Sequence, residues 1–225
     1  MGRTRLTRRI LTGALLLAMV VLAIIAFRSG REIVTRLDEY AEARTEYASL
    51  REQFGVPSDT ADSESETEVA DTAETEGIDF DALRAINPNV VGWIVVPGTQ
   101  ISYPVVQGAD NAWYLRHTFS GERNASGAIF MDYRNRADFS DNQTILHGHN
   151  MRDGSMFAPL HGWAGDRFVI HTPDGVLEFE VFNCQAVPAT GEIFQLRDTE
   201  DGVRTVTLST CISGSPGLRF VVQGQ

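Results

Sequence analysis

The feature that most restricts the fold is a series of short apolar runs after Gly77, each ended by Gly, Pro, Asn or Asp. Runs of about four to eight such residues between turn formers are typical of strands. We expect eight strands, at 92–96, 101–105, 127–131, 143–146, 167–171, 176–187, 203–209 and 218–222. A short helix at 79–86, ended by Asn87-Pro88, and a helical turn at 155–160 accompany them. This pattern predicts a mainly β fold that is closed, or nearly closed, into a barrel.

An acidic segment at residues 57–76 precedes these strands. Eight acidic residues and no basic ones lie between Ser58 and Glu76, among Ser, Thr and Ala. Such a segment repels itself and has too few apolar residues to collapse, so we predict a disordered linker; a specific binding role is the alternative. One folded domain remains at 77–225, long enough to bury a core without disulfides or metals. We expect a chain that starts near Glu76 to fold.

The N-terminal part has a different pattern. Residues 1–9 contain four arginines, and residues 10–27 form an apolar run of 18 residues without charge. A cleaved signal peptide also has a basic start and an apolar middle, but this run is longer than usual and lacks small residues at the cleavage spacing. We therefore predict a single-pass transmembrane anchor, with residues 1–9 in the cytoplasm and the rest outside the cell membrane. Residues 28–56, rich in helix formers, are expected to form a juxtamembrane helical stalk.

The net charge and the absence of Lys each exclude one class of function. The formal net charge is -11, and the predicted domain has no cluster of basic residues that could bind phosphates, so no nucleic-acid partner is expected. All 19 basic residues are Arg. The absence of Lys excludes catalysis through a lysine Schiff base.

The two cysteines, Cys184 and Cys211, lie in different patterns. In an exported domain an even number of cysteines allows a disulfide, so a non-catalytic surface module with a Cys184–Cys211 bridge is one hypothesis. Cys184 lies inside an alternating apolar run, which is typical of a small core or sheet residue. Cys211 ends a β-type run and precedes the turn-rich segment 212–217, where a substrate could reach it. Cys211 is therefore the candidate nucleophile.

His147 and His149 follow an apolar run at positions i and i+2. Side chains at that spacing on a strand share a face, but the chain has no further ligand cluster and no zinc-type cysteine spacing, so no metal is expected. A cysteine attacks as a thiolate, and an imidazole that takes its proton and later protonates a leaving amine is its natural partner. Arg219 returns to the same end of the sheet if a hairpin connects it to Cys211. It is then either a charge that stabilises an oxyanion or an ordinary solvated arginine.

Seven strings resemble those of class B sortases, in the same order. They are Asn87–Ile94, Ile101–Gln107, Asn111–Leu115, Gly127–Asp132, Gly148–Met151, Ser155–Phe157 and Thr207–Cys211. The resemblance extends over about residues 80–222. It implies an eight-stranded sortase-type β-barrel with short helices, preceded by the transmembrane helix and stalk. It also implies Cys211 as nucleophile, His149 rather than His147 as general acid and base, and Arg219 as the residue that stabilises the oxyanion or the substrate.

The same resemblance implies a reaction without a cofactor. Cys211 would cleave the C-terminal sorting signal of a secreted protein through a thioacyl intermediate. An amine of the peptidoglycan precursor would then accept the protein, anchoring it to a Gram-positive cell wall. A pilin amine as acceptor would give a pilin polymerase, and water a cysteine peptidase. The substrate-binding residues implied are Leu208, Ser209, Thr210 and Asn150.

Two features depart from the class B pattern. Members usually have a long helix-containing segment before the cysteine strand, but only 188–202 lies there in this chain, and the loop 212–218 is also short. Because the longer segment helps to form the groove for the signal, the resemblance does not carry over the sorting motif. His117, His161 and His171 match no motif position and are expected to be surface or packing residues.

Overall fold

The computed structural model describes residues 2–55, 77–196 and 202–225, without the side chains of residues 2–12, 14–16, 18 and 33. The predicted acidic linker, residues 57–76, lies outside the described residues. The chain forms two compact units, one ending at Ala41 and the other extending from Glu42 to Gln225. The second unit contains the β domain and, with it, all three predicted catalytic residues.

One helix, α1 (Gly2–Phe54), contains the predicted anchor at 10–27 and residues 28–54 of the predicted stalk. Among the described residues, no helix combines the length and the apolar character that a bilayer crossing requires. The second unit begins within α1 and not at residue 77. The reason is a buried apolar stripe at i, i+4 and i+7, made of Ala43, Tyr47 and Leu50.

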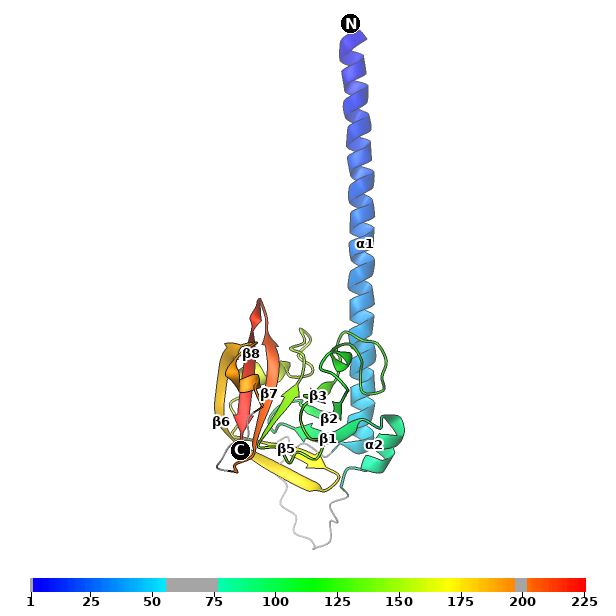
Figure 1. Cartoon of the computed structure of the whole chain (residues 1–225). Helices are drawn as coiled ribbons and strands as arrows, with labels where there is room; N and C mark the ends of the chain where they lie inside the picture. The colour runs from blue at the N-terminus through cyan, green and yellow to red at the C-terminus, as the bar shows by residue number, and fades with distance from the viewer. Residues whose placement is uncertain (1, 56–76, 197–201) are drawn as a thin grey trace, which may run out of the picture. The chain divides into compact units, whose positions relative to one another are not determined.

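Eight strands close into a barrel, as the sequence predicts (Figure 1). They are β1 (Val90–Val95), β2 (Ser102–Gln107), β3 (Ile129–Met131), β4 (Gln143–His147), β5 (Arg167–Thr172), β6 (Gly175–Pro188), β7 (Thr205–Ile212) and β8 (Ser215–Gly224). Their order around the barrel is β1-β2-β3-β4-β7-β8-β6-β5. The pairs β2–β3 and β4–β7 are parallel and the other pairs are antiparallel.

The expected loop at 212–218 is instead a tight turn. β7 continues through Cys211 to Ile212, and β8 begins at Ser215. Only Ser213 and Gly214 form the turn, and Gly214 has a φ of 77°, which glycine adopts at little cost. Cys211 therefore lies inside a paired strand near its end and not at the edge of a flexible loop.

Four short helical segments complete the described part of the domain. Helix α2 (Phe80–Ile86) begins where Asp79 accepts a hydrogen bond from the Ala82 N–H at 2.9 Å, and it ends before Pro88, as expected. The helical turn expected at 155–160 is the 3₁₀ helix η2 (Ala158–Gly162). The other two are η1 (Trp113–Leu115) and η3 (Glu192–Phe194).

Aromatic side chains fill the core of the barrel. Trp93, Phe130, Phe157 and Phe168 are among the largest fully buried side chains. The one polar group of Trp93 is satisfied, because its Nε1–H donates to Ser102 Oγ at 2.9 Å. The strand ends that carry the candidate site are thus held by a close-packed interior.

Candidate active site

The parallel pairing of β4 and β7 places His149 beside Cys211. His147 on β4 is the register partner of Ser209 on β7. His149 and Cys211 each lie two residues further along, so both lie at the same end of neighbouring strands. The Gly148 N–H donates to the Ser209 carbonyl at 3.1 Å, which continues the pairing past the end of β4.

The hairpin of β7 and β8 brings Arg219 to the same place. Arg219 is the direct cross-strand partner of Cys211, as the hairpin hypothesis requires. Directly opposed residues of an antiparallel pair have Cα atoms about 4.5–5.5 Å apart. The Arg219 guanidinium donates through Nη1 to the carbonyl oxygens of Pro216 and Leu218, at 3.0 and 2.9 Å. These two bonds hold the arginine close to the turn.

A pocket of about 300 Å³ is lined by His149, Cys211 and Arg219 together. Two predicted substrate-binding residues, Ser209 and Thr210, also line it. Thr210 Oγ1 is a buried atom with no hydrogen-bond partner among the described residues.

The other two predicted substrate-binding residues lie elsewhere. Leu208 is fully buried and is not among the residues that line the pocket. Its side chain therefore belongs to the core. Asn150 does not line the pocket either, but its Nδ2 donates to the Cys211 carbonyl oxygen at 3.0 Å. Asn150 therefore contacts the backbone of the predicted nucleophile.

The imidazole of His149 is oriented by a backbone carbonyl. Its Nε2 lies 2.8 Å from the carbonyl oxygen of Leu115 in η1. Because a carbonyl only accepts, Nε2 carries a proton in this contact, and Nδ1 is the nitrogen left to exchange a proton with a thiol. The other histidine of the motif has a different partner: His147 Nε2 lies 3.4 Å from Asp132 Oδ2.

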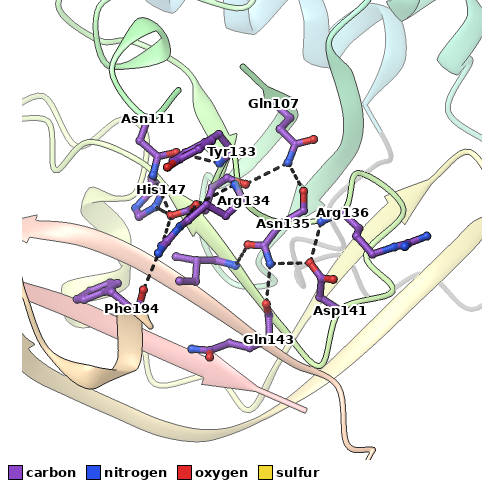
Figure 2. Close-up of polar contacts among 12 residues, drawn as sticks. Gln107, Asn111, Tyr133, Arg134, Asn135, Arg136, Asp141, Gln143, His147 and Phe194 are labelled. Atoms are coloured by element: carbon purple, nitrogen blue, oxygen red, sulfur yellow. Dashed lines mark hydrogen bonds and ion pairs between the residues drawn. The ribbon is translucent and has the colours of Figure 1, made fainter. Parts of the chain in front are cut away.

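A charged cluster forms another wall of the pocket. Figure 2 shows the polar contacts of this cluster, among them the bond from Arg134 to Phe194. Arg134 donates from Nε and Nη2 to the two carboxylate oxygens of Asp132, both at 2.8 Å, and from Nη2 to the Phe194 carbonyl at 3.0 Å. Asn111 Nδ2 donates to Asp132 Oδ2 at 2.8 Å. Burial alone would raise the pKa of Asp132, but the bonds from Arg134, His147 and Asn111 together hold it well below its usual value.

The sequence pattern predicts no role for this cluster. Asp132 and Asn111 lie within the strings that resemble class B sortases, and no motif includes Arg134. A local signal is present, because Asp132 and Arg134 lie at i and i+2 just beyond the apolar strand β3. That spacing allows an ion pair at the strand end, although it does not show that the pair faces a pocket.

Cys184 and Cys211 are both free thiols, which removes the structural basis of the disulfide hypothesis. Cys184 lies on β6 opposite Val222 of β8, so it is a sheet residue, but it is exposed and not part of the core. Partial desolvation raises the pKa of the Cys184 thiol, which lowers its thiolate fraction at neutral pH. Cys184 is therefore poorly suited to the role assigned to Cys211.

Of the three histidines outside the motifs, His161 has an unexpected contact. Its Nε2 lies 3.0 Å from the carbonyl oxygen of Cys211. His117 stacks on the exposed Trp113, and His171 lies half-buried on β5, so both are surface or packing residues as expected. No sequence pattern indicates the His161 contact, because the two residues are 50 positions apart.

Comparison with known proteins identifies the family. Residues 94–225 match the family described as Sortase domain. The chain belongs to the sortase family. Sortase B of Listeria monocytogenes is 39% identical over 117 residues, 52% of this chain and 46% of the relative. Sortase B of Staphylococcus aureus is 31% identical over 166 residues, 74% of this chain and 63% of the relative.

The solved structures agree with this assignment. The Staphylococcus aureus sortase B–substrate complex matches with a TM-score of 0.67 and 26% identity, over 83% of this chain and 96% of that chain. The predicted class B resemblance and the sortase-type barrel are therefore confirmed. The chain spans from about half to somewhat less than two thirds of the length of the two curated relatives that it matches.

In this sortase the short segment before β7 still contributes to the pocket. Ala189 and Phe194, from its described part, line the pocket. Gln143 Nε2 donates to the Ile193 carbonyl at 2.6 Å, and Arg134 donates to that of Phe194. The segment is thus attached to the barrel through η3.

Proposed function

We propose that this sortase is a cysteine transpeptidase with Cys211 as its nucleophile. The observation that supports it is the register that sets Cys211 between His149 on the parallel side and Arg219 on the antiparallel side, at one pocket. A thiol, an imidazole and a permanent cation in this arrangement suit acyl transfer through a thioester.

The first half of the reaction forms the acyl enzyme. Nδ1 of His149 takes the proton of the Cys211 thiol, and the thiolate attacks a backbone carbonyl of the bound sorting signal. The guanidinium of Arg219 stabilises the oxyanion that develops. As the C–N bond breaks, His149 returns the proton to the leaving amine, and a thioacyl enzyme remains.

The second half transfers the acyl group to an amine. The acceptor nitrogen attacks the thioester carbonyl, His149 takes the proton that the amine loses, and an amide bond replaces the C–S bond. The Cys211 thiolate leaves and regains a proton, so the enzyme is unchanged. We propose an amine of the peptidoglycan precursor as the acceptor; a pilin amine would use the same steps and give a polymer.

The substrate is proposed to be the C-terminal sorting signal of a secreted protein. The Staphylococcus aureus relative is known as a complex with its substrate, which supports binding of such a signal here. Ser209 and Thr210, which line the pocket beside Cys211, are the residues proposed to contact it.

The cellular location is also a proposal. The uncharged run 10–27 follows four arginines, which supports a single-pass anchor in the cell membrane with the N-terminus inside. The test compares the full chain with a chain that lacks residues 1–27, by membrane fractionation and by protease treatment of intact protoplasts. Membrane recovery and outside cleavage of the full chain alone support the anchor; equal recovery of both chains refutes it.

The activity is tested by mass spectrometry of the enzyme with sorting-signal peptides and small amine acceptors, beside Cys211→Ala. A thioacyl adduct on Cys211, and a joined product that requires the amine and is absent from the variant, are expected. Product release that does not depend on the amine would indicate a peptidase. Joined product from Cys211→Ala would refute the assignment of the nucleophile.

A further inference from the structure

His161 on η2 contacts the backbone of the catalytic strand. Its Nε2 lies 3.0 Å from the Cys211 carbonyl oxygen and 3.1 Å from Asn150 Nδ2. Asn150 Nδ2 lies 3.0 Å from the same carbonyl oxygen. The three atoms therefore form a nearly equilateral triangle around one peptide group of β7.

The ring of His161 also touches the strand that carries Arg219. It stacks on Phe220 of β8, with ring centroids 4.7 Å apart and an interplanar angle of 29°. Asn150 directly follows His149, and Phe220 directly follows Arg219. One side chain thus contacts all three segments that supply the proposed catalytic residues.

The arrangement of protons favours one tautomer of His161. A carbonyl oxygen has two lone pairs, so it can accept from Asn150 Nδ2–H and from His161 Nε2–H at the same time. The other neutral tautomer would let Nε2 accept from Asn150 Nδ2–H at 3.1 Å, but it would direct the Nε2 lone pair at the carbonyl oxygen, at 3.0 Å. The contact with the Cys211 carbonyl therefore stabilises the Nε2–H form of His161.

The Cys211 carbonyl lies where the regular pairing of β7 with β8 ends. The ladder of β7 and β8 is regular up to the Cys211–Arg219 pair, and its register shifts before Ile212. Such an irregularity leaves the local backbone less constrained by the ladder. Two side-chain donors at this peptide group compensate for that loss.

We propose that His161 is a positioning residue for the nucleophile. With Asn150, it fixes the Cys211 carbonyl and, through the backbone, the direction in which the Cys211 thiol points at His149. The inference rests on the proposed role of Cys211. It assigns His161 no contact with the substrate, so its loss lowers kcat and leaves KM unchanged.

Two substitutions separate the hydrogen bond from the packing. His161→Phe keeps an aromatic ring on Phe220 and removes the donor, and kcat for joining a peptide to an amine is expected to fall about fivefold to tenfold. His161→Gln supplies an amide N–H at a similar reach, and most of kcat is expected to return. The matched control is His171→Gln on β5, outside the pocket lining, with kcat unchanged.

Two results of these kinetic measurements would each contradict the proposed role of His161. Wild-type kcat in His161→Phe would overturn the inference. Equal losses in both His161 variants, together with equal falls in melting temperature, would also overturn it, because packing alone would then explain the effect.

A readout independent of transpeptidation separates this inference from the proposed function. The rate of Cys211 alkylation by iodoacetamide, followed by peptide mass, should change in His161→Phe and recover in His161→Gln. Nitrogen-15 NMR of the wild type should show the Nε2–H tautomer of His161, and the Nδ1–H tautomer would overturn the inference. If these results hold and no peptide is joined, the proposed function fails and the positioning role stands.

Discussion

Removing the hydroxyl of Tyr47 is expected to loosen the attachment of α1 to the β domain. The Tyr47 hydroxyl donates to the Gly127 carbonyl at 2.7 Å and accepts from the Phe119 N–H at 3.2 Å, and the residue is only 3% exposed. Burial is the main cause that raises the pKa of Tyr47, so the group stays neutral and able to donate. Tyr47→Phe leaves the ring in place and removes both bonds.

The loss follows from the burial of both partners. Withdrawing a partner from two buried backbone groups costs about 2–3 kcal/mol in total. For a domain of this size, that corresponds to a fall in melting temperature of about 4–12 °C. The segment at Gly127 is bonded to η1, because the Ala128 N–H donates to the Tyr114 carbonyl at 3.0 Å. The residue after Tyr114, Leu115, supplies the carbonyl that holds His149. A loosened segment should therefore also lower activity.

The assay is thermal unfolding followed by circular dichroism, with Tyr133→Phe as the matched control. Tyr133 is 51% exposed, so its hydroxyl can exchange a protein partner for water and the control should unfold like the wild type. Equal melting temperatures for Tyr47→Phe and the wild type would refute the reasoning. A chain that starts at residue 77 should fold but be less stable than one that starts at Glu42, because it lacks the buried stripe of α1.

Three further changes test the site and its supports. The low pKa of Asp132 means that its carboxylate stabilises the fold at neutral pH and that this contribution is lost as pH falls below about 4. The melting-temperature difference between wild type and Asp132→Asn should therefore shrink from pH 7 toward pH 3; a constant difference would contradict this. Gly148→Ala puts a methyl group 2.5 Å from Ile129 Cδ1 and should cost about 1–3 kcal/mol in urea unfolding, whereas Gly217→Ala meets no atom within 4 Å and should cost much less. Thiol titration should find two free thiols in the native wild type and one in active Cys184→Ser; none in the wild type would restore the disulfide hypothesis.

The barrel could be predicted from sequence because its strands are marked locally. Each apolar run ends at turn formers, and α2 has both an acceptor at Asp79 and a stop at Pro88. The placement of Arg219 opposite Cys211 needed only the assumption of a hairpin, which the pairing confirms. The expected length of the loop after Cys211 was wrong, because Gly214 allows a tight turn and β8 begins earlier than its apolar run suggests.

The contacts that sequence could not predict join distant segments. Tyr47 and Gly127 are 80 residues apart, and the acidic segment between them suggested separate units. Residues 28–56 were expected to be helical, but a helical pattern does not show what the buried stripe with Tyr47 packs against. His161 illustrates the same limit, since nothing near it in the chain indicates a partner on β7.

The pairing of β4 and β7 explains how the site tolerates a short segment before the cysteine strand. In a parallel pair both strands end at the same edge, so the residues that follow His147 and Ser209 stay side by side. Arg219 depends only on the turn that follows Cys211. Neither arrangement involves the connection from β6 to β7. Changes of length in that connection therefore alter the pocket wall, where Phe194 lies, and leave the register of the catalytic residues in place.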